Sequence, residues 1–215
     1  IGANIVSFSI LANRHPNLTS HAFEPNPETF EILNNNVSLN DLGDKIKTYQ
    51  VALSDNKGTA ILKIPTSVTD CGFASIGQPK RFDHWREIEI QTRTLDDFAY
   101  ENNIGKVDLI KIDTEGCELF VLQGGEEFIK RHRPNIFTEC DQRCTYQFGY
   151  DTEEIIDLLT SWGYQYAKIS HEDLFFYIPS ETICRVRPHV MRNRQKIKDD
   201  AKNFFMPDIS ETDFV

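Results

Sequence analysis

One twelve-residue stretch, VDLIKIDTEGCE at positions 107–118, constrains this chain more than any other. Its first half is apolar and rich in β-branched residues, which is typical of a strand buried on both faces of a parallel sheet. The strand ends at Asp113, and Glu115 and Glu118 follow closely. In open α/β sheets, ligands bind beyond the carboxyl ends of the strands. The stretch therefore predicts an α/β fold with a site at Asp113.

Carboxylates this close together raise one another's pKa unless a cation or a reacting proton uses them. A purely structural alternative is that Glu115 and Glu118 lie in the first turn of the next helix, where the helix dipole stabilises acids. For Glu118 we leave the two interpretations open. Asp113 ends the strand itself, so we expect it at a functional site.

A second buried strand, expected at 135–140, also ends in acids, Glu139 and Asp141. Carboxylates delivered by two strands to one edge of a sheet make a pocket there more probable than either would alone. The alternative is that Glu139 forms an ion pair with a nearby arginine such as Arg143.

The beginning of the chain reads as a strand end, a tight turn at Gly2 and a helix that continues to about Arg14. A strand at 18–24 then closes on Glu24, and Pro25 precedes a helix at 27–36. Glu24 follows Gly2 at about the spacing of 20 residues found in nucleotide-binding βαβ units, where an acid accepts hydrogen bonds from ribose hydroxyls.

The remaining pattern alternates strands and helices, as an α/β domain requires. A polar, glycine-containing loop at 71–80 is expected to face a substrate, because long loops in compact domains are more often functional than idle. We expect a strand at 45–53, its hairpin return at 59–64, a strand at 87–93, a helix capped by Thr94 to 102, helices at 116–123 and up to 132, a helix at 152–162, and a terminal hairpin of 164–170 with 174–178.

The composition fits one soluble domain at 1–180 followed by a polar extension at 181–215, with 40% hydrophobic and 26% charged residues in 215. A net charge of -10 argues against a nucleic-acid partner. No window is apolar enough for a membrane span or a leader. Five scattered cysteines suggest reduced thiols and a cytoplasmic location. Cys140 and Cys144 lack a matching second pair, so we expect no metal site.

The order of these motifs resembles the FkbM family of S-adenosylmethionine-dependent methyltransferases. The resemblance spans about residues 1–178. It rests on IGAN at 1–4, AFEPNPETF at 22–30, VALSD at 51–55 and the stretch at 107–118, with TLDD at 94–97 and the strand after Arg133-Pro134 in support.

The resemblance implies a Rossmann-like class I methyltransferase fold, with helices on both faces of a seven-stranded, mostly parallel sheet whose last strand is antiparallel. It also implies O-methylation of a hydroxyl on a sugar, glycolipid or polyketide-type acceptor, with S-adenosylmethionine as the cofactor. Its implied cofactor-binding residues are Gly2, Ala3 and Asn4 at the methionine part, Glu24 and Pro25 at the ribose, Ala52 and Leu53 at the adenine, and Asp113 at the sulfonium.

Methyl transfer to a hydroxyl leaves a proton that a carboxylate must accept, since no histidine follows either acidic strand. Asp113 is the first candidate because it is the first polar residue after its strand. Glu139 is the second, and Glu115 completes the set of catalytic candidates.

The chain departs from the family's first motif, D-x-G-A-N-x-G, at two points. It begins after the Asp, so we expect the first strand to be truncated, and Val6 replaces the final Gly. We expect the Val6 methyl groups to narrow the approach to the cofactor.

A different class remains open: a catalytically silent Rossmann-like binding or scaffold module of a larger protein. The acids at the strand ends favour the enzyme, since a scaffold has no physical need for them. A nicotinamide dehydrogenase would require a fuller glycine fingerprint.

Overall fold

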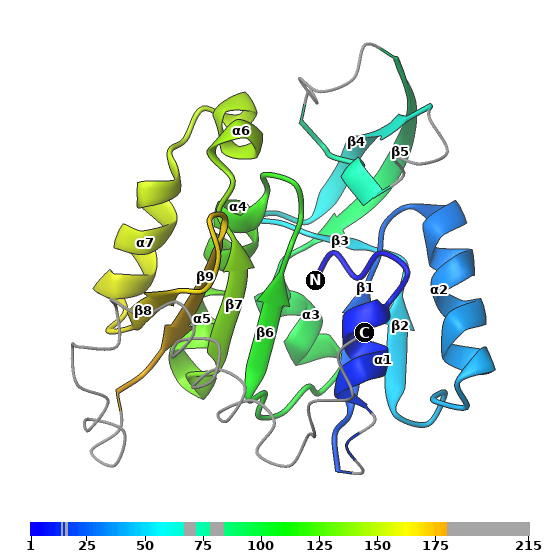
Figure 1. Cartoon of the computed structure of the whole chain (residues 1–215), viewed down its shortest axis with the longest axis horizontal. Helices are drawn as coiled ribbons and strands as arrows, with labels where there is room; N and C mark the ends of the chain where they lie inside the picture. The colour runs from blue at the N-terminus through cyan, green and yellow to red at the C-terminus, as the bar shows by residue number, and fades with distance from the viewer. Residues whose placement is uncertain (14, 16, 67–71, 78–83, 180–215) are drawn as a thin grey trace.

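The computed structural model of this chain describes residues 1–13, 15, 17–66, 72–77 and 84–179 (Figure 1). The expected extension at 181–215, Arg14 at the expected end of the first helix, and both ends of the loop at 71–80 lie outside these residues. The described part is a mixed α/β fold whose strands form three hydrogen-bonded sheets.

The first two sheets contain the strands of the N-terminal half. β1 (Ser20–Phe23) pairs in parallel with β2 (Ile46–Tyr49). β3 (Ala52–Leu53) runs parallel to β5 (Trp85–Arg93), and β5 pairs along its other edge with the antiparallel β4 (Gly58–Pro65).

These pairings correct two expectations. The strand predicted at 45–53 is split, because the chain leaves the β1 ladder after Tyr49 and the short β3 joins β5 instead. The predicted hairpin return at 59–64 is wrong in its partner: β4 pairs with β5, which offers it a continuous register from Gly58 opposite Thr92 to Pro65 opposite Trp85.

The third sheet has the order β6-β7-β9-β8. β6 (Leu109–Ile112) and β7 (Asn135–Glu139) are parallel, whereas β9 (Asp173–Tyr177) is antiparallel to β7 and forms a hairpin with β8 (Gln165–Lys168). The predicted terminal hairpin is therefore confirmed, as is the buried character of β6, in which Ile112 is fully buried.

Residues 1–3 lie between β1 and β6, where Figure 1 marks the N-terminus. The amino group of Ile1 donates to the Lys111 carbonyl (2.8 Å), and the Asp113 amide donates to the Ile1 carbonyl (3.2 Å). On the other side, the Ala3 amide donates to the Phe23 carbonyl (2.8 Å). Residues 1–3 form no strand of their own. The predicted seven-stranded sheet is therefore not observed as one ladder, although hydrogen bonds connect β1 to β6 through residues 1–3.

Two helices show how a side chain at the helix start accepts hydrogen bonds from backbone amides of the first turn. Thr94 Oγ1 accepts from the Asp97 amide (3.1 Å), and Asp151 with Glu154 forms a complete capping box. Figure 1 draws α1 in front of the strands, with α3 and α5 behind them. The helical elements are α1 (Ser7–Ala12), α2 (Pro27–Leu39), α3 (Leu95–Glu101), α4 (Glu118–Gln123), α5 (Glu126–His132), α6 (Gln142–Thr145), the 3-10 helix η2 (Tyr146–Phe148) and α7 (Thr152–Ser161).

The main hydrophobic core packs the β6-β7-β9 strands against α4, α5 and α7, and it includes the fully buried Ile112, Ile136 and Phe176. Complete burial of such a side chain stabilises the fold by about 1.5–3 kcal/mol. This core fixes the carboxyl ends of β6 and β7. Within the described residues, no helix combines the length and apolarity needed to cross a bilayer.

Candidate functional site at the carboxyl ends of the strands

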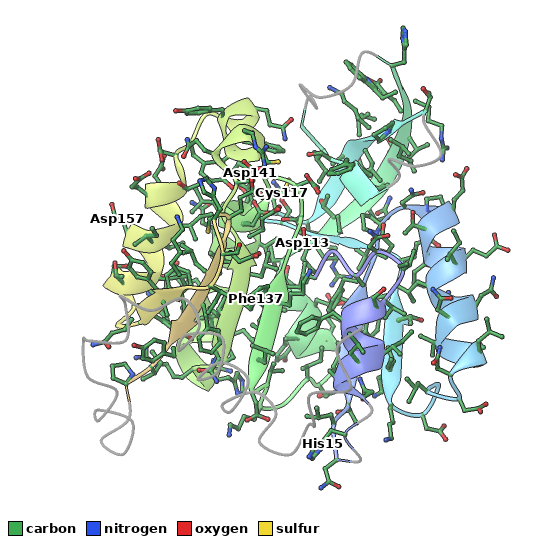
Figure 2. All side chains as sticks on the ribbon, viewed as in Figure 1. His15, Asp113, Cys117, Phe137, Asp141 and Asp157 are labelled. Atoms are coloured by element: carbon green, nitrogen blue, oxygen red, sulfur yellow. The ribbon has the colours of Figure 1, made fainter. Side chains whose placement is uncertain are left out.

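A cavity of about 320 Å³ lies where β1, β6 and β7 end. Its walls include Glu24 after β1, Asp113 after β6 and Glu139 at the end of β7. Figure 2 labels Asp113, Cys117 and Asp141 at this end of the strands, on the side of the β4–β5 hairpin. The parallel strands thus bring together acids that are far apart in the sequence.

Gly2 makes the closest approach between the N-terminal turn and β6. Its φ is +69°, and a β-carbon placed on it would lie 1.7 Å from the Asp113 carbonyl oxygen. No side chain fits there without moving one of the two segments. The glycine therefore holds the turn directly against the strand end that carries Asp113.

Glu24 is held in place by two backbone amides and is only 7% exposed. Its Oε2 accepts from the Asn4 amide and its Oε1 from the Asn26 amide, each at 2.9 Å. Burial raises the pKa of this carboxyl, and the two amide donors act in the opposite direction. Each oxygen retains a further lone pair, so Glu24 can still accept hydrogen bonds from a ligand's hydroxyls.

Asp113, Glu115 and Glu139 converge at one side of the cavity, with one carboxylate oxygen from each lying within 4.8 Å of the others. Burial, followed by the negative charges of Asp113 and Glu115, raises the pKa of Glu139 to about 8. Its Oε2 is buried and has no hydrogen-bond partner among the described residues. Glu139 is thus mainly protonated at neutral pH, which relieves the crowding of charge.

Asp113 and Glu139 differ in whether a lysine or arginine side chain pairs with them. Lys111 Nζ lies 2.6 Å from Asp113 Oδ2, so Asp113 already has a counter-charge. The arginine that we considered as a partner for Glu139 is engaged elsewhere: Arg143 forms ion pairs with Asp141 and Glu172. Neither Lys111 nor Arg143 therefore forms an ion pair with Glu139.

Glu118 is the first residue of α4, as the structural alternative proposed, but its carboxylate turns back toward the preceding loop. Its Oε1 accepts from the Thr114 amide (2.8 Å), the Thr114 hydroxyl (2.9 Å) and the Gly116 amide (3.2 Å). The residue is 1% exposed and does not line the cavity. It supports the loop that carries Glu115.

Residues 72–76, from the loop between β4 and β5, form a further wall of the cavity. Ser75 anchors them: it forms a β-bridge with Lys63, and its hydroxyl donates to the Glu115 carbonyl (2.8 Å). Gln147 Nε2 donates to the same carbonyl at 3.1 Å. The described part of the loop expected to face a substrate therefore does border the cavity.

Of the residues predicted to bind the cofactor, all but Ala3 line the cavity: Gly2, Asn4, Glu24, Pro25, Ala52, Leu53 and Asp113. Ala3 instead packs against the small core around Val6. The cavity also includes residues that the sequence analysis did not single out. Phe23 and Thr29 adjoin the Glu24 motif and could have been found from it, whereas Leu62 and Cys117 gave no signal of their own.

Val6 does not stand where we expected it. It is 1% exposed and lies in a core with Ala22, Leu33, Val37 and Ile46, and it does not line the cavity. Its φ of 70° places a β-branched residue in the left-handed region, where glycine is favoured. The expected narrowing of the cofactor approach is therefore wrong, and the substitution strains the backbone instead.

Taken together, the fold and the cavity define an α/β protein with a ligand site at the carboxyl ends of its strands. The family model described as Methyltransferase FkbM domain matches residues 1–166. The chain belongs to the FkbM methyltransferase family.

Similar proteins with assigned names agree with this assignment. The 2-O-methyltransferase NoeI of Sinorhizobium fredii is 30% identical over 160 residues, which cover 68% of this chain and 63% of that protein. Methyltransferase sdnD of Sordaria araneosa is 30% identical, with 59% of each chain covered. The 31-O-demethyl-FK506 methyltransferase FkbM of Streptomyces tacrolimicus is 29% identical, with 59% of this chain and 58% of that one covered. The chain thus spans about three-fifths of the length of these relatives.

The solved structures provide a match to the fold. The crystal structure of methyltransferase FkbM from Methylobacillus flagellatus KT superposes with a TM-score of 0.52 at 19% identity. The match covers 82% of this chain and 42% of that one.

Proposed function

We propose that this chain is an S-adenosylmethionine-dependent O-methyltransferase domain. Family membership supports methyl transfer, and the cavity fits the cofactor. Glu24 offers free lone pairs to ribose hydroxyls, and the buried Asn4 Oδ1 has no partner among the described residues and can accept from an ammonium group. The close approach of Gly2 to the Asp113 backbone places the turn that carries Asn4 against the end of β6.

The observation that carries this proposal is the arrangement of Gly2, Glu24 and Asp113 around one cavity. In the proposed site, Gly2 and Asn4 lie toward the methionine part, Glu24 and Pro25 toward the ribose, and Ala52 and Leu53 toward the adenine. We further propose that residues 1–3 occupy the position of the central strand in a class I methyltransferase sheet. Their hydrogen bonds to both β1 and β6 support that position.

S-adenosylmethionine supplies a methyl group that is already activated by positive sulfur. The protein must align the acceptor hydroxyl and remove its proton as the new O–CH3 bond forms and the S–CH3 bond breaks. We propose Glu139 as the proton acceptor, because a base with a pKa near the working pH is the most effective and the pKa of Glu139 is about 8. Asp113, which already has Lys111 beside it, remains the second candidate.

For the acceptor we propose a hydroxyl of a sugar, glycolipid or polyketide-type molecule. The relatives named for 2-O-methylation and for 31-O-demethyl-FK506 support a hydroxyl acceptor. The alternative, a silent module of a larger protein, has less support, because it gives no role to the acids that line the cavity.

Calorimetric titration with S-adenosylmethionine tests the cofactor, and radiolabelled methyl transfer to 31-O-demethyl-FK506 and to simple methyl glycosides tests the reaction. We expect saturable binding that weakens about ten- to a hundredfold in Glu24→Gln, because charge-assisted hydrogen bonds contribute about 1.5–3 kcal/mol. Glu31→Gln, an exposed change on α2, is the matched control. Absence of cofactor binding in the parent would favour the silent module, and binding of NAD instead would indicate a dehydrogenase.

A further inference from the structure

The loop between β6 and α4, residues 113–117, provides the acidic side of the cavity, and two side chains outside the cavity add to the hold that Ser75 and Gln147 have on it. The first is Glu118, whose buried Oε1 accepts three hydrogen bonds from Thr114 and Gly116. A carboxylate that gathers several donors on one oxygen fixes the backbone between them. Glu118 therefore sets the path of the chain on either side of Glu115.

The second side chain is Tyr150, which reaches the loop from the segment preceding α7. It is 6% exposed, and its hydroxyl donates to the Gly116 carbonyl at 2.8 Å. The same hydroxyl lies 3.4 Å from Glu118 Oε2 and accepts from the Leu119 amide at 3.5 Å. Tyr150 thus links the loop and α4 to the segment that precedes α7, within the main core.

The loop needs such support because its conformation is strained. Glu115 has a φ of 54° and Gly116 a φ of 105°. A left-handed residue other than glycine costs about 1–2 kcal/mol. A β-carbon on Gly116 would lie 2.5 Å from the Cys144 carbonyl oxygen, so the loop also packs closely against α6. The bonds to Glu118 and Tyr150 act at Thr114 and Gly116, on either side of the left-handed Glu115, whereas Ser75 and Gln147 hold the Glu115 carbonyl itself.

On the basis of the methyltransferase function proposed above, we propose that Glu118 and Tyr150 are positioning residues that clamp the β6–α4 loop and so fix Asp113 and Glu115 opposite Glu139. Neither residue lines the cavity, so neither contacts cofactor or acceptor there. Their effect on the reaction is exerted through the loop.

Glu118 also acts on Glu139 through its charge. Asp113 at the end of β6, Glu115 in the loop, Glu118 on α4 and Asp141 before α6 all raise the pKa of Glu139, after burial itself. Asp173 of β9 lies opposite Glu139 in the strand register. Burial raises the pKa of Glu118 itself, so its charge acts on Glu139 only where Glu118 is ionised, and there Glu118→Gln should lower the pKa of Glu139.

The test compares Glu118→Gln and Tyr150→Phe with matched controls, Glu127→Gln on the exposed first turn of α5 and Tyr100→Phe, whose ring is 86% exposed. Amide hydrogen exchange at Thr114 and Gly116 reports the loop directly. In Glu118→Gln the amide oxygen still accepts from Thr114 and Gly116, but these bonds lose their charge assistance; in Tyr150→Phe the bond to the Gly116 carbonyl is lost. A weakening of about 1–1.5 kcal/mol in either variant should speed exchange there about five- to tenfold. Carbon NMR titration of the Glu139 carboxyl should show a lower pKa in Glu118→Gln only.

Kinetics then separate positioning from binding. With 31-O-demethyl-FK506 or a methyl glycoside as the acceptor probe, we expect the single-turnover rate to fall about ten- to a hundredfold while the S-adenosylmethionine Kd changes less than about threefold. The double variant should lose less than the two single losses combined. Unchanged exchange at Thr114 and Gly116 would overturn the clamp, as would faster exchange with an unchanged transfer rate.

This design keeps the two proposals distinct. If the parent chain transfers no methyl group to any probe, the proposed function fails, yet the exchange and titration results still decide whether Glu118 and Tyr150 hold the loop. If the parent is active and the control substitutions alter the transfer rate while Glu118→Gln and Tyr150→Phe do not, the clamp fails and the proposed function stands.

Discussion

Gly2 and Asp113 are in contact through their backbones: a β-carbon on Gly2 would lie 1.7 Å from the Asp113 carbonyl oxygen and 2.8 Å from its carbonyl carbon. The glycine is therefore the point at which the N-terminal turn and the end of the acid-bearing strand are brought together. The first prediction tests this contact.

Gly2→Ala should weaken S-adenosylmethionine binding at least about tenfold. The methyl group must displace the Asp113 backbone, and the φ of +69° is itself unfavourable for alanine. Calorimetry measures the affinity. Gly43→Ala, where a β-carbon would meet nothing within 4 Å, is the control and should leave it unchanged. Full affinity in Gly2→Ala would mean that the turn does not border the cofactor.

The pH dependence of transfer should follow Glu139. With a pKa of about 8, the carboxyl becomes an ionised base only as the pH rises, so kcat/KM should increase about tenfold per pH unit below pH 8 and level off above it. The positive sulfur of bound S-adenosylmethionine should lower the pKa of a nearby carboxyl. The pH profile of kcat, which reports the cofactor complex, should therefore level off at a lower pH than that of kcat/KM. Initial rates from pH 5.5 to 9.5 measure both profiles.

Two variants identify the base. Glu139→Gln should remove the pH-dependent rise and reduce the rate at least about a hundredfold. Asp113→Asn removes one of the charges that raise the Glu139 pKa. The pH–rate profile of this variant should therefore shift to lower pH and keep its shape. The reverse pattern, with the rise lost in Asp113→Asn and retained in Glu139→Gln, would assign the base to Asp113.

Val6 should respond to substitution in an unusual order. Val6→Ala loses about 1–2 kcal/mol of apolar burial and keeps the left-handed strain, whereas Val6→Gly loses the burial but relieves that strain. We therefore expect Val6→Gly to be at least as stable as Val6→Ala in chemical denaturation. At Val37, buried within α2, glycine should be about 1 kcal/mol worse than alanine. If alanine were about 1 kcal/mol more stable than glycine at Val6 as well as at Val37, that result would argue against strain at Val6.

Chelation should leave the reaction unchanged. Asp113, Glu115 and Glu139 are close enough to hold a cation, but a proton on Glu139 already reduces their mutual repulsion. Rates measured with EDTA and with added Mg²⁺ or Mn²⁺ should agree within error. Stimulation by either metal that disappears in Glu139→Gln would assign the three acids to a metal site.

Much of the fold follows from local sequence patterns. The apolar run of β6, the cap at Thr94 and the terminal hairpin each depend on neighbouring residues, so they were predictable. The convergence of Asp113 and Glu139 was also expected, because parallel strands end at the same edge of a sheet.

What the sequence did not show depends on distant partners. β4 could have paired with any exposed strand edge, and only the full register with β5 decides between them. The left-handed backbone at Val6 and the inward turn of the Glu118 carboxylate arise from packing that no single-residue preference encodes. The contacts of Ser75 and Gln147 with Glu115 join two separate loops and η2, and no spacing rule relates them.

The anchor at Ser75 bears on how such a protein diversifies. One buried serine, paired with Lys63 and bonded to the Glu115 carbonyl, attaches the wall of residues 72–76 to the rest of the site. In the proposed methyltransferase, substitutions among residues 72–76 can change this wall of the cavity while Glu24, Asp113 and Glu139 keep their places. Selection for a new acceptor can therefore act on this loop separately from selection for the cofactor.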